Sequence, residues 1–143
     1  MKKYVFVYLF YFVASNLISC FSQDSVYYNI ENLILNKDYY KALADVNKIL
    51  SDNPNDFKAL KYKINILYFL DKYDEAENII EKIIKKYSDD YELYYLSGIV
   101  NIGKKKYKKA IDDLTKALAT EDRDLLHKIY LARGIAFMNY EFY

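Results

Sequence analysis

The chain has 143 residues, with 21 basic and 20 acidic residues and a formal net charge of +1. Hydrophobic residues make up 53% of it, but there are only three Gly, one Pro, one Cys and one His. The balanced charge argues against nucleic-acid binding. The single Cys excludes a disulfide framework, and the scarcity of Cys and His argues against a metal site. The few turn residues disfavour a β-sheet protein.

The first 20 residues, MKKYVFVYLFYFVASNLISC, form a separate segment. Lys2 and Lys3 precede an uncharged, mostly apolar run over 4–18, and the small residue Ser19 follows it. This order of a positive, an apolar and a small-residue region is typical of a secretory signal peptide. Residues 4–23 are also long enough to span a bilayer, so an uncleaved anchor and ordinary cleaved secretion remain alternatives.

The end of this segment, LISC over 17–20, resembles the lipobox of bacterial lipoprotein precursors. That pattern consists of an aliphatic residue, a tolerant position, a small residue and a Cys. The resemblance implies that residues 1–19 are removed, that Cys20 carries a covalent lipid, and that residues 20–25 form a tether before a domain over 26–143. It further implies a location in the bacterial cell envelope, with the lipid holding the protein to a membrane. No other cofactor is expected.

A Tyr followed three positions later by an Ala recurs at a constant interval along the chain. The three pairs are Tyr39–Ala42, Tyr73–Ala76 and Tyr107–Ala110. Further apolar residues follow each Tyr at seven, ten and eleven positions, which places them with the Ala on one face of a helix. The spacing therefore predicts three amphipathic helices that begin at these Tyr residues.

A second amphipathic helix is expected before each of these, over 26–35, 57–70 and 91–102. Asp56 and Asp90 stand where an N-cap carboxylate would accept backbone N–H groups. Gly103 stands where a left-handed residue would end the third of these helices. A final helix is expected over about 124–140.

This helix–turn–helix unit of about 34 residues resembles the tetratricopeptide repeat, or TPR. The resemblance implies an all-α repeat solenoid of about 3.5 repeats, over 23–56, 57–90, 91–126 and, in part, 127–143. Ile30 and Ile64 replace the small residue of the first helix, so those helix pairs are expected to pack less closely. A generic helical bundle is the alternative. The residues that match the repeat signature are Tyr39, Ala42, Pro54, Tyr73, Ala76, Gly98, Tyr107, Ala110 and Gly134.

In the TPR family, fixed positions of the first helices line a concave groove, and the resemblance implies the same here. The mixed aromatic, Lys and Asn character of the matching positions suits an extended peptide. Lys61 and Asn65 match two positions of a clamp for a peptide C-terminus, but Leu96 stands where that clamp needs Asn. The matching groove residues are Tyr27, Glu31, Ile34, Lys58, Lys61, Asn65, Tyr68, Phe69, Glu92, Tyr95, Ile99 and Ile102.

No enzyme is indicated, because the chain lacks a Gly-rich phosphate loop and its only His, His127, has no nucleophile near it in the sequence. We therefore expect a lipid-anchored scaffold that binds a protein or peptide partner. One alternative is a structural surface lipoprotein without a groove ligand, which self-associates through its aromatic C-terminal end. Another is a shortened, nonfunctional version of a longer repeat protein. The C-terminal end in question comprises Phe137, Met138, Tyr140, Phe142 and Tyr143.

Overall fold

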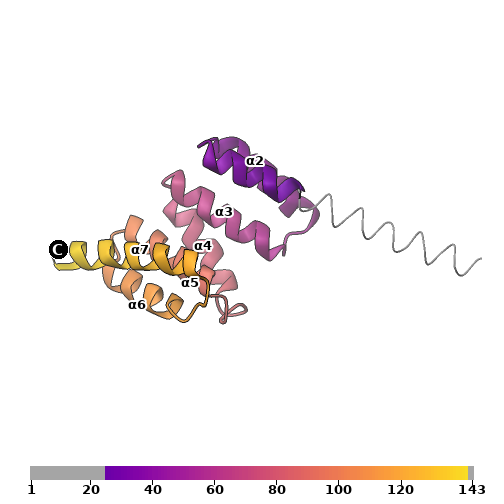
Figure 1. Ribbon diagram of the computed structural model, residues 1–143. Coiled ribbons are helices and arrows are strands. Elements are labelled where there is room, and N and C mark those ends of the chain that lie inside the picture. Colours follow the sequence, from indigo (N-terminus) through magenta and orange to yellow (C-terminus); the bar gives the residue numbers. More distant parts are fainter. Residues whose placement is uncertain (1–24, 142–143) are drawn as a thin grey trace, which may run out of the picture. The chain divides into compact units, whose positions relative to one another are not determined.

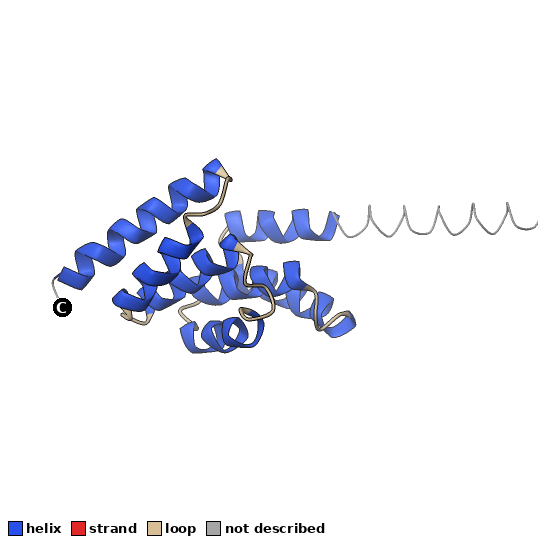
Figure 2. Ribbon diagram, turned by 90° about the horizontal axis from the view of Figure 1, so that it is seen from below, coloured by secondary structure: helices blue, strands red, loops and turns tan. Residues whose placement is uncertain are grey.

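The computed structural model describes residues 25–141. The predicted signal peptide over 1–19, the lipidation of Cys20 and most of the tether lie outside the described residues, as do Phe142 and Tyr143. The described part is built of α-helices joined by short turns and contains no strand (Figures 1 and 2). The predicted all-α helical repeat is therefore confirmed.

The described residues fall into two compact units that divide after Ala42. The first unit holds a helix over 25–35 and the beginning of α2, Tyr39–Asp52. In the second unit, each predicted helix begins within one residue of its expected start. Its complete helices are α3 (Phe57–Phe69), α4 (Tyr73–Ile83), α5 (Tyr91–Gly103), α6 (Tyr107–Ala117) and α7 (Arg123–Glu141).

Acidic side chains cap the first helices of the second unit. The Asp56 carboxylate accepts a hydrogen bond of 3.0 Å from the backbone N–H of Ala59, at the start of α3. Asp90 accepts one of 2.7 Å from Leu93 in the same way at the start of α5. Each carboxylate satisfies a backbone N–H that has no partner within the helix. Both predicted N-caps are confirmed.

The turns inside the helix pairs recur with the same period as the Tyr–Ala pairs. Lys37, Asp71 and Lys105 have left-handed backbones, with φ of 62°, 57° and 58°. In each turn the residue after them donates its N–H to the carbonyl five positions back, at 2.8–2.9 Å. This is the Schellman arrangement, which satisfies carbonyls at the end of a helix.

The prediction that Gly103 takes this left-handed position is wrong, because Gly103 is the last residue of α5 and no described Gly has a positive φ. Gly103 serves a different purpose. A Cβ atom at this position would overlap the ring of Tyr73 on α4, so only Gly allows the ring to lie against the end of α5. The close approach of a neighbouring side chain, and not the turn itself, explains this Gly.

Lys37→Gly is expected to raise the free energy of unfolding by about 0.5–1 kcal/mol, because Gly adopts a left-handed backbone without a steric penalty. Thermal unfolding followed by circular dichroism measures the change. Lys41→Gly, on an exposed helical position of α2, is the matched control and should lower stability by up to about 1 kcal/mol. Equal destabilisation by both substitutions would contradict the role of the left-handed backbone.

The helices of the second unit pack in the order of a repeat protein. Each contacts the next along the chain, and the first helices α3, α5 and α7 also contact one another in sequence. Ala76 and Ala110 are fully buried, as the repeat signature predicts. The α5–α6 pair packs most extensively, since a Cβ atom on Gly98 would overlap the Leu114 side chain. Ile64 stands at the corresponding place in α3, and the contact between α3 and α4 is smaller, as expected.

Candidate functional site

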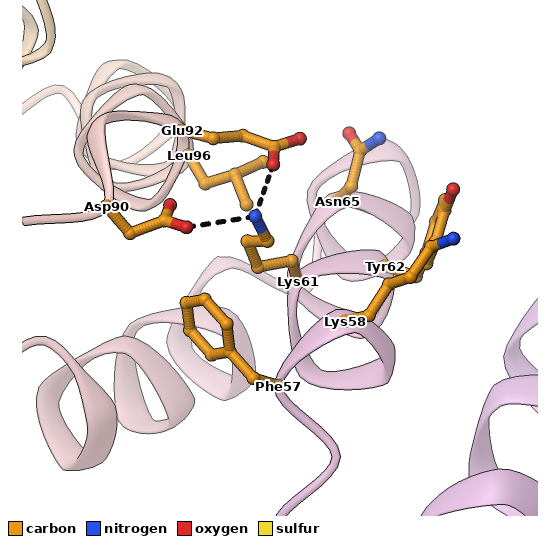
Figure 3. Close-up of a pocket in the computed structure, with 8 residues that line it drawn as sticks. All are labelled: Phe57, Lys58, Lys61, Tyr62, Asn65, Asp90, Glu92 and Leu96. Atoms are coloured by element: carbon orange, nitrogen blue, oxygen red, sulfur yellow. Dashed lines mark hydrogen bonds and ion pairs between the residues drawn. The ribbon is translucent and has the colours of Figure 1, made fainter. Parts of the chain in front are cut away.

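A pocket of about 350 Å³ lies between the first helices α3 and α5 (Figure 3). This volume lies at the lower end of the range for small-ligand pockets. Four predicted groove residues line it: Lys58, Lys61, Asn65 and Glu92. The other lining residues are Phe57, Tyr62, Asp90 and Leu96. Side chains from two successive repeats thus meet at one place, because successive first helices stack side by side.

The ammonium group of Lys61 lies between two carboxylates from the start of α5. Its Nζ is 3.1 Å from Asp90 and is also hydrogen-bonded to Glu92 (Figure 3). Burial lowers the pKa of Lys61, but the hydrogen bonds and negative charges of Glu92 and Asp90 outweigh it, so the pKa is raised. Lys61 is therefore engaged within the chain. Together with the buried Leu96, this is inconsistent with a carboxylate clamp at this position.

The Phe57 ring supports this ion pair. It stacks on Tyr87 with 3.7 Å between the ring centroids, and Lys61 Nζ lies 5.0 Å from the Phe57 centroid. A cation over an aromatic face is stabilised by the ring quadrupole. Because the rings and the two carboxylates hold Lys61 from several sides, this wall of the pocket is pre-organised.

Asn65 offers the pocket an amide that is open to a ligand. Its side chain is half-buried and has no hydrogen-bond partner among residues 25–141. Figure 3 shows its amide directed away from the ion pair of Lys61. An Asn amide both donates and accepts, which matches the N–H and C=O of a peptide backbone.

The remaining predicted groove residues do not line this pocket. The prediction is wrong for Tyr27 and Ile99, which are only 3% and 6% exposed. Glu31 is exposed and Ile34 half-buried, but both belong to the first unit. Tyr68 lies 5.9 Å from the Tyr73 ring and 5.4 Å from the Phe69 ring, away from the pocket lining. Tyr95 and Ile102 are half-buried, and burial raises the pKa of Tyr95.

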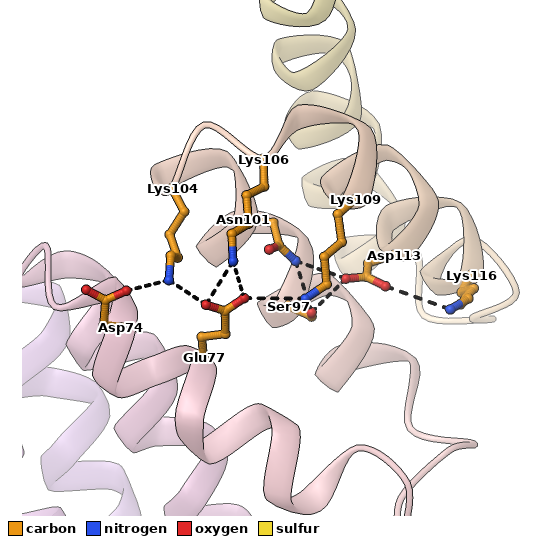
Figure 4. A network of polar contacts seen from close by, with 9 residues as sticks. All are labelled: Asp74, Glu77, Ser97, Asn101, Lys104, Lys106, Lys109, Asp113 and Lys116. Carbon is orange, nitrogen blue, oxygen red and sulfur yellow. Dashed lines mark hydrogen bonds and ion pairs between the residues drawn. The ribbon is translucent and has the colours of Figure 1, made fainter.

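A second polar cluster links α4 to the start of α6 (Figure 4). Glu77, whose side chain is only 14% exposed, accepts hydrogen bonds from Lys104 and Lys106 and lies 3.4 Å from Lys109 Nζ. Lys104 also pairs with Asp74. The hydrogen bonds from Lys104 and then Lys106 lower the pKa of Glu77 to about 2, despite the opposing effect of burial. The only signal for this cluster in the sequence is the basic run at 104–109, one repeat after DEAE at 74–77.

A buried polar group holds α5 to α6. Ser97 donates its hydroxyl to Asp113 at 2.7 Å, and the Asn101 amide donates to the same carboxylate oxygen at 3.1 Å. All three side chains are at least nine-tenths buried. No pattern in the sequence indicates these three residues, because they lie among apolar positions of two different helices.

Comparison with known proteins places this arrangement in a family. A family model described as the TT21 fifth ARM repeats domain matches residues 30–125. The chain belongs to this helical-repeat family. Its helix pairs recur at about 34 residues, the length of a TPR, so this repeat protein is TPR-like.

Individual relatives of the helical-repeat chain agree with this assignment. Signal recognition particle subunit SRP72 of Dictyostelium discoideum is 29% identical over 104 residues, which are 73% of this chain and 15% of that protein. The solved structure of MamA, residue 41 to the end, from Desulfovibrio magneticus RS-1 matches with a TM-score of 0.60 and 23% identity. The match covers 81% of this chain and 70% of the MamA chain. A MamA RS-1 ArsTM double mutant gives a TM-score of 0.59 over the same shares. These structures show the fold.

The described part of the repeat protein holds neither a metal site nor a membrane-spanning helix. Residues 25–141 contain no cluster of three or more side chains arranged to hold a metal ion. In the same range no helix combines the length and apolarity that crossing a bilayer requires.

Acid is expected to destabilise the repeat protein through Glu77. Its pKa falls from about 4.5 to about 2 on folding, so the ionised form stabilises the fold fully above pH 4.5, and this contribution is lost as the pH drops toward 2. Glu77→Gln should lower the free energy of unfolding at neutral pH. It should also make the free energy of unfolding depend less on pH between pH 5 and pH 2. Urea unfolding at several pH values measures both. Glu81→Gln, on an exposed position of α4, is the control; an equal change in it would contradict the role of the cluster.

Proposed function

We propose that this chain is a protein-binding scaffold, and that the pocket between α3 and α5 holds an extended segment of its partner. The observation that carries the proposal is the Asn65 amide, which has no partner in the described chain and faces a pocket of about 350 Å³. Lys58 lines the same pocket on an exposed position of α3. Asn65 would bond the peptide backbone, Lys58 would attract an acidic side chain, and the Tyr62 ring would contact side chains of the segment.

The fold and the relatives support a role in binding. Stacked helix pairs present an extended surface to partners. SRP72 is, by its name, a subunit of a particle, and thus a protein that associates with others. We propose a binding and not a catalytic role, because the pocket holds an ion pair, an amide and aromatic rings but no nucleophile with a neighbouring base.

We further propose that the scaffold is held to a membrane of the bacterial cell envelope by a lipid on Cys20. The support is the LISC sequence at 17–20 after a positive and apolar segment, with Cys20 as the only Cys in the chain. A lipid anchor would confine the pocket to the vicinity of the membrane, so its partner would be an envelope protein. Sequence resemblance alone carries this part of the proposal.

Site-specific photo-crosslinking in cells tests the pocket. A crosslinking amino acid at Asn65 in the full chain is expected to capture one partner in near-stoichiometric amount, whereas the same group at the exposed Lys85 should not. Lys58→Ala should reduce capture from position 65, and Lys108→Ala, the matched control on an exposed position of α6 outside the pocket, should leave it unchanged. Equal capture from positions 65 and 85 would contradict the pocket assignment. In the same cells, Cys20→Ser should release the protein from the membrane fraction, and continued retention would contradict the lipid anchor.

A further inference from the structure

The last helix of the second unit, α7, buries only a narrow stripe. Ile129, Ala132 and Ala136 are buried, at spacings of three and four positions that define one side of the helix. This side contacts α5 and α6. In Figure 2 the C-terminal helix lies at the edge of the second unit, and no other helix of that unit covers its opposite side.

The opposite side of α7 is apolar and exposed. Tyr130 is 59% exposed, Leu131 70% and Met138 59%, and Ile135 and Phe137 are also exposed. Gly134 lies among them, and a Cβ atom on it would meet nothing within 4 Å. Isolated exposed apolar residues are ordinary, but a contiguous face of this kind marks an interaction surface.

Helix α5 shows what such a face is suited to contact. Gly98, Ile99 and Asn101 on α5 occupy the positions that correspond, one repeat earlier, to Gly134, Ile135 and Phe137. All three α5 residues are buried, and both Gly98 and Asn101 face side chains of α6. The exposed face of α7 thus repeats the helix-binding face of α5, but without a covering helix in the described chain.

We propose that this face binds the α7 helix of a second copy of the chain, with the two helices antiparallel about a two-fold axis at the level of Ala132. Arg123 and Glu141 are separated by about five helical turns, so they lie at opposite ends of one side of α7. Tyr130 and Gly134 lie on that same side. An antiparallel partner centred at this level places Arg123 of each copy opposite Glu141 of the other, and each Tyr130 ring over the partner's open Gly134.

Charge and shape therefore select the same alignment. Arg123 and Glu141 have no ion-pair partner among residues 25–141, so both are available for the second copy. A two-fold axis requires a surface that is complementary to itself. The face of α7 has a cation at one end and an anion at the other, so two copies are complementary in charge when their helices are antiparallel. The inference is independent of the pocket between α3 and α5, which lies on other helices.

Charge reversal tests the alignment. The full chain, purified in detergent, is expected to change from monomer to dimer as its concentration rises in sedimentation velocity runs. Arg123→Glu or Glu141→Arg alone should weaken dimerisation by about tenfold, since each sets like charges opposite one another twice. The double variant, Arg123→Glu with Glu141→Arg, should restore it. Leu131→Glu should abolish it and leave the circular dichroism spectrum unchanged, because Leu131 is largely exposed.

Three results would overturn the proposal. The first is a chain that stays monomeric at about 100 μM, a concentration well above the dissociation constant of an ordinary stable dimer. The second is a dimer that neither single charge reversal weakens, which would exclude the antiparallel alignment. The third is a crosslink from a Cys at position 131, in a Cys20→Ser background, that forms in cells with a different protein and not with a second copy.

Discussion

Gly98→Leu is expected to lower the free energy of unfolding by about 3 kcal/mol. The first atom of any side chain at this position would overlap Leu114 of α6. Leu114 is fully buried, so it cannot rotate into solvent without leaving a cavity in the core. The two helices would have to separate, and they form the most extensive helix contact in the second unit. Urea unfolding measures the loss.

A double-mutant cycle separates this mechanism from a general effect of helix composition. Leu114→Ala alone should cost about 2–5 kcal/mol, because it removes buried methyl groups. In the double variant the leucine side chain introduced at position 98 enters the vacated space, so the combined loss should be at least about 1 kcal/mol smaller than the sum. Gly134→Ala is the matched control and should raise stability by up to about 1 kcal/mol at concentrations where the chain is monomeric, since its Cβ would lie in open space. Strict additivity would show that Gly98 and Leu114 do not determine each other's packing.

Asp113→Ala is expected to cost about 2–3 kcal/mol, because it leaves the buried Ser97 hydroxyl without its acceptor and leaves the Asn101 amide with only a long hydrogen bond of 3.4 Å to Ser97 Oγ. The carbonyl oxygen Oδ1 of Asn101 is already buried without a hydrogen-bond partner in the described chain. Asp113→Ala adds unsatisfied donors to this unsatisfied acceptor, and the Ser97 hydroxyl could reach the Asn101 carbonyl only if the buried side chains rotated. Thermal unfolding measures the loss, and Asp112→Ala, an exposed neighbour on the same helix, should change stability by less than about 0.5 kcal/mol.

A second variant shows whether the polar group of Ser97, Asn101 and Asp113 stabilises the α5–α6 contact more than apolar residues would. Replacing all three residues by apolar ones, with Ser97→Ala, Asn101→Leu and Asp113→Leu, removes every unsatisfied group at once. Buried polar groups are often no more stabilising than apolar residues of similar volume, so this variant should recover most of the lost stability. If the triple variant is less stable than Asp113→Ala, the polar group itself stabilises the α5–α6 contact.

The helices could be predicted from the sequence because their information is local and repeated. Tyr73 and Tyr107 mark helix starts, and Asp56 and Asp90 mark caps, through contacts with residues close to them along the chain. Gly103 shows the limit of this reasoning. Its neighbour in space is Tyr73, on the preceding helix, and the turn that it was expected to form is made by Lys105.

The candidate site was predictable only in part. Position within the repeat was enough to assign Lys58, Lys61, Asn65 and Glu92 to one surface, and these four do line one pocket. It could not show that Lys61 is held by Asp90 and Glu92, or that Ile99 is buried. Those facts depend on the distance between neighbouring first helices, which no pattern along a single helix contains.

Local patterns were enough to specify an all-α repeat with a regular period, because helical periodicity and N-caps depend on residues near one another along the chain. The packing of the helices in space was needed to establish which charges are already paired, which glycines are crowded and which apolar face remains uncovered. Gly98 and Gly134 are both matches to the small position of the repeat, yet one lies against Leu114 and the other has open space around it. The difference arises because packing depends on whether another helix follows in space.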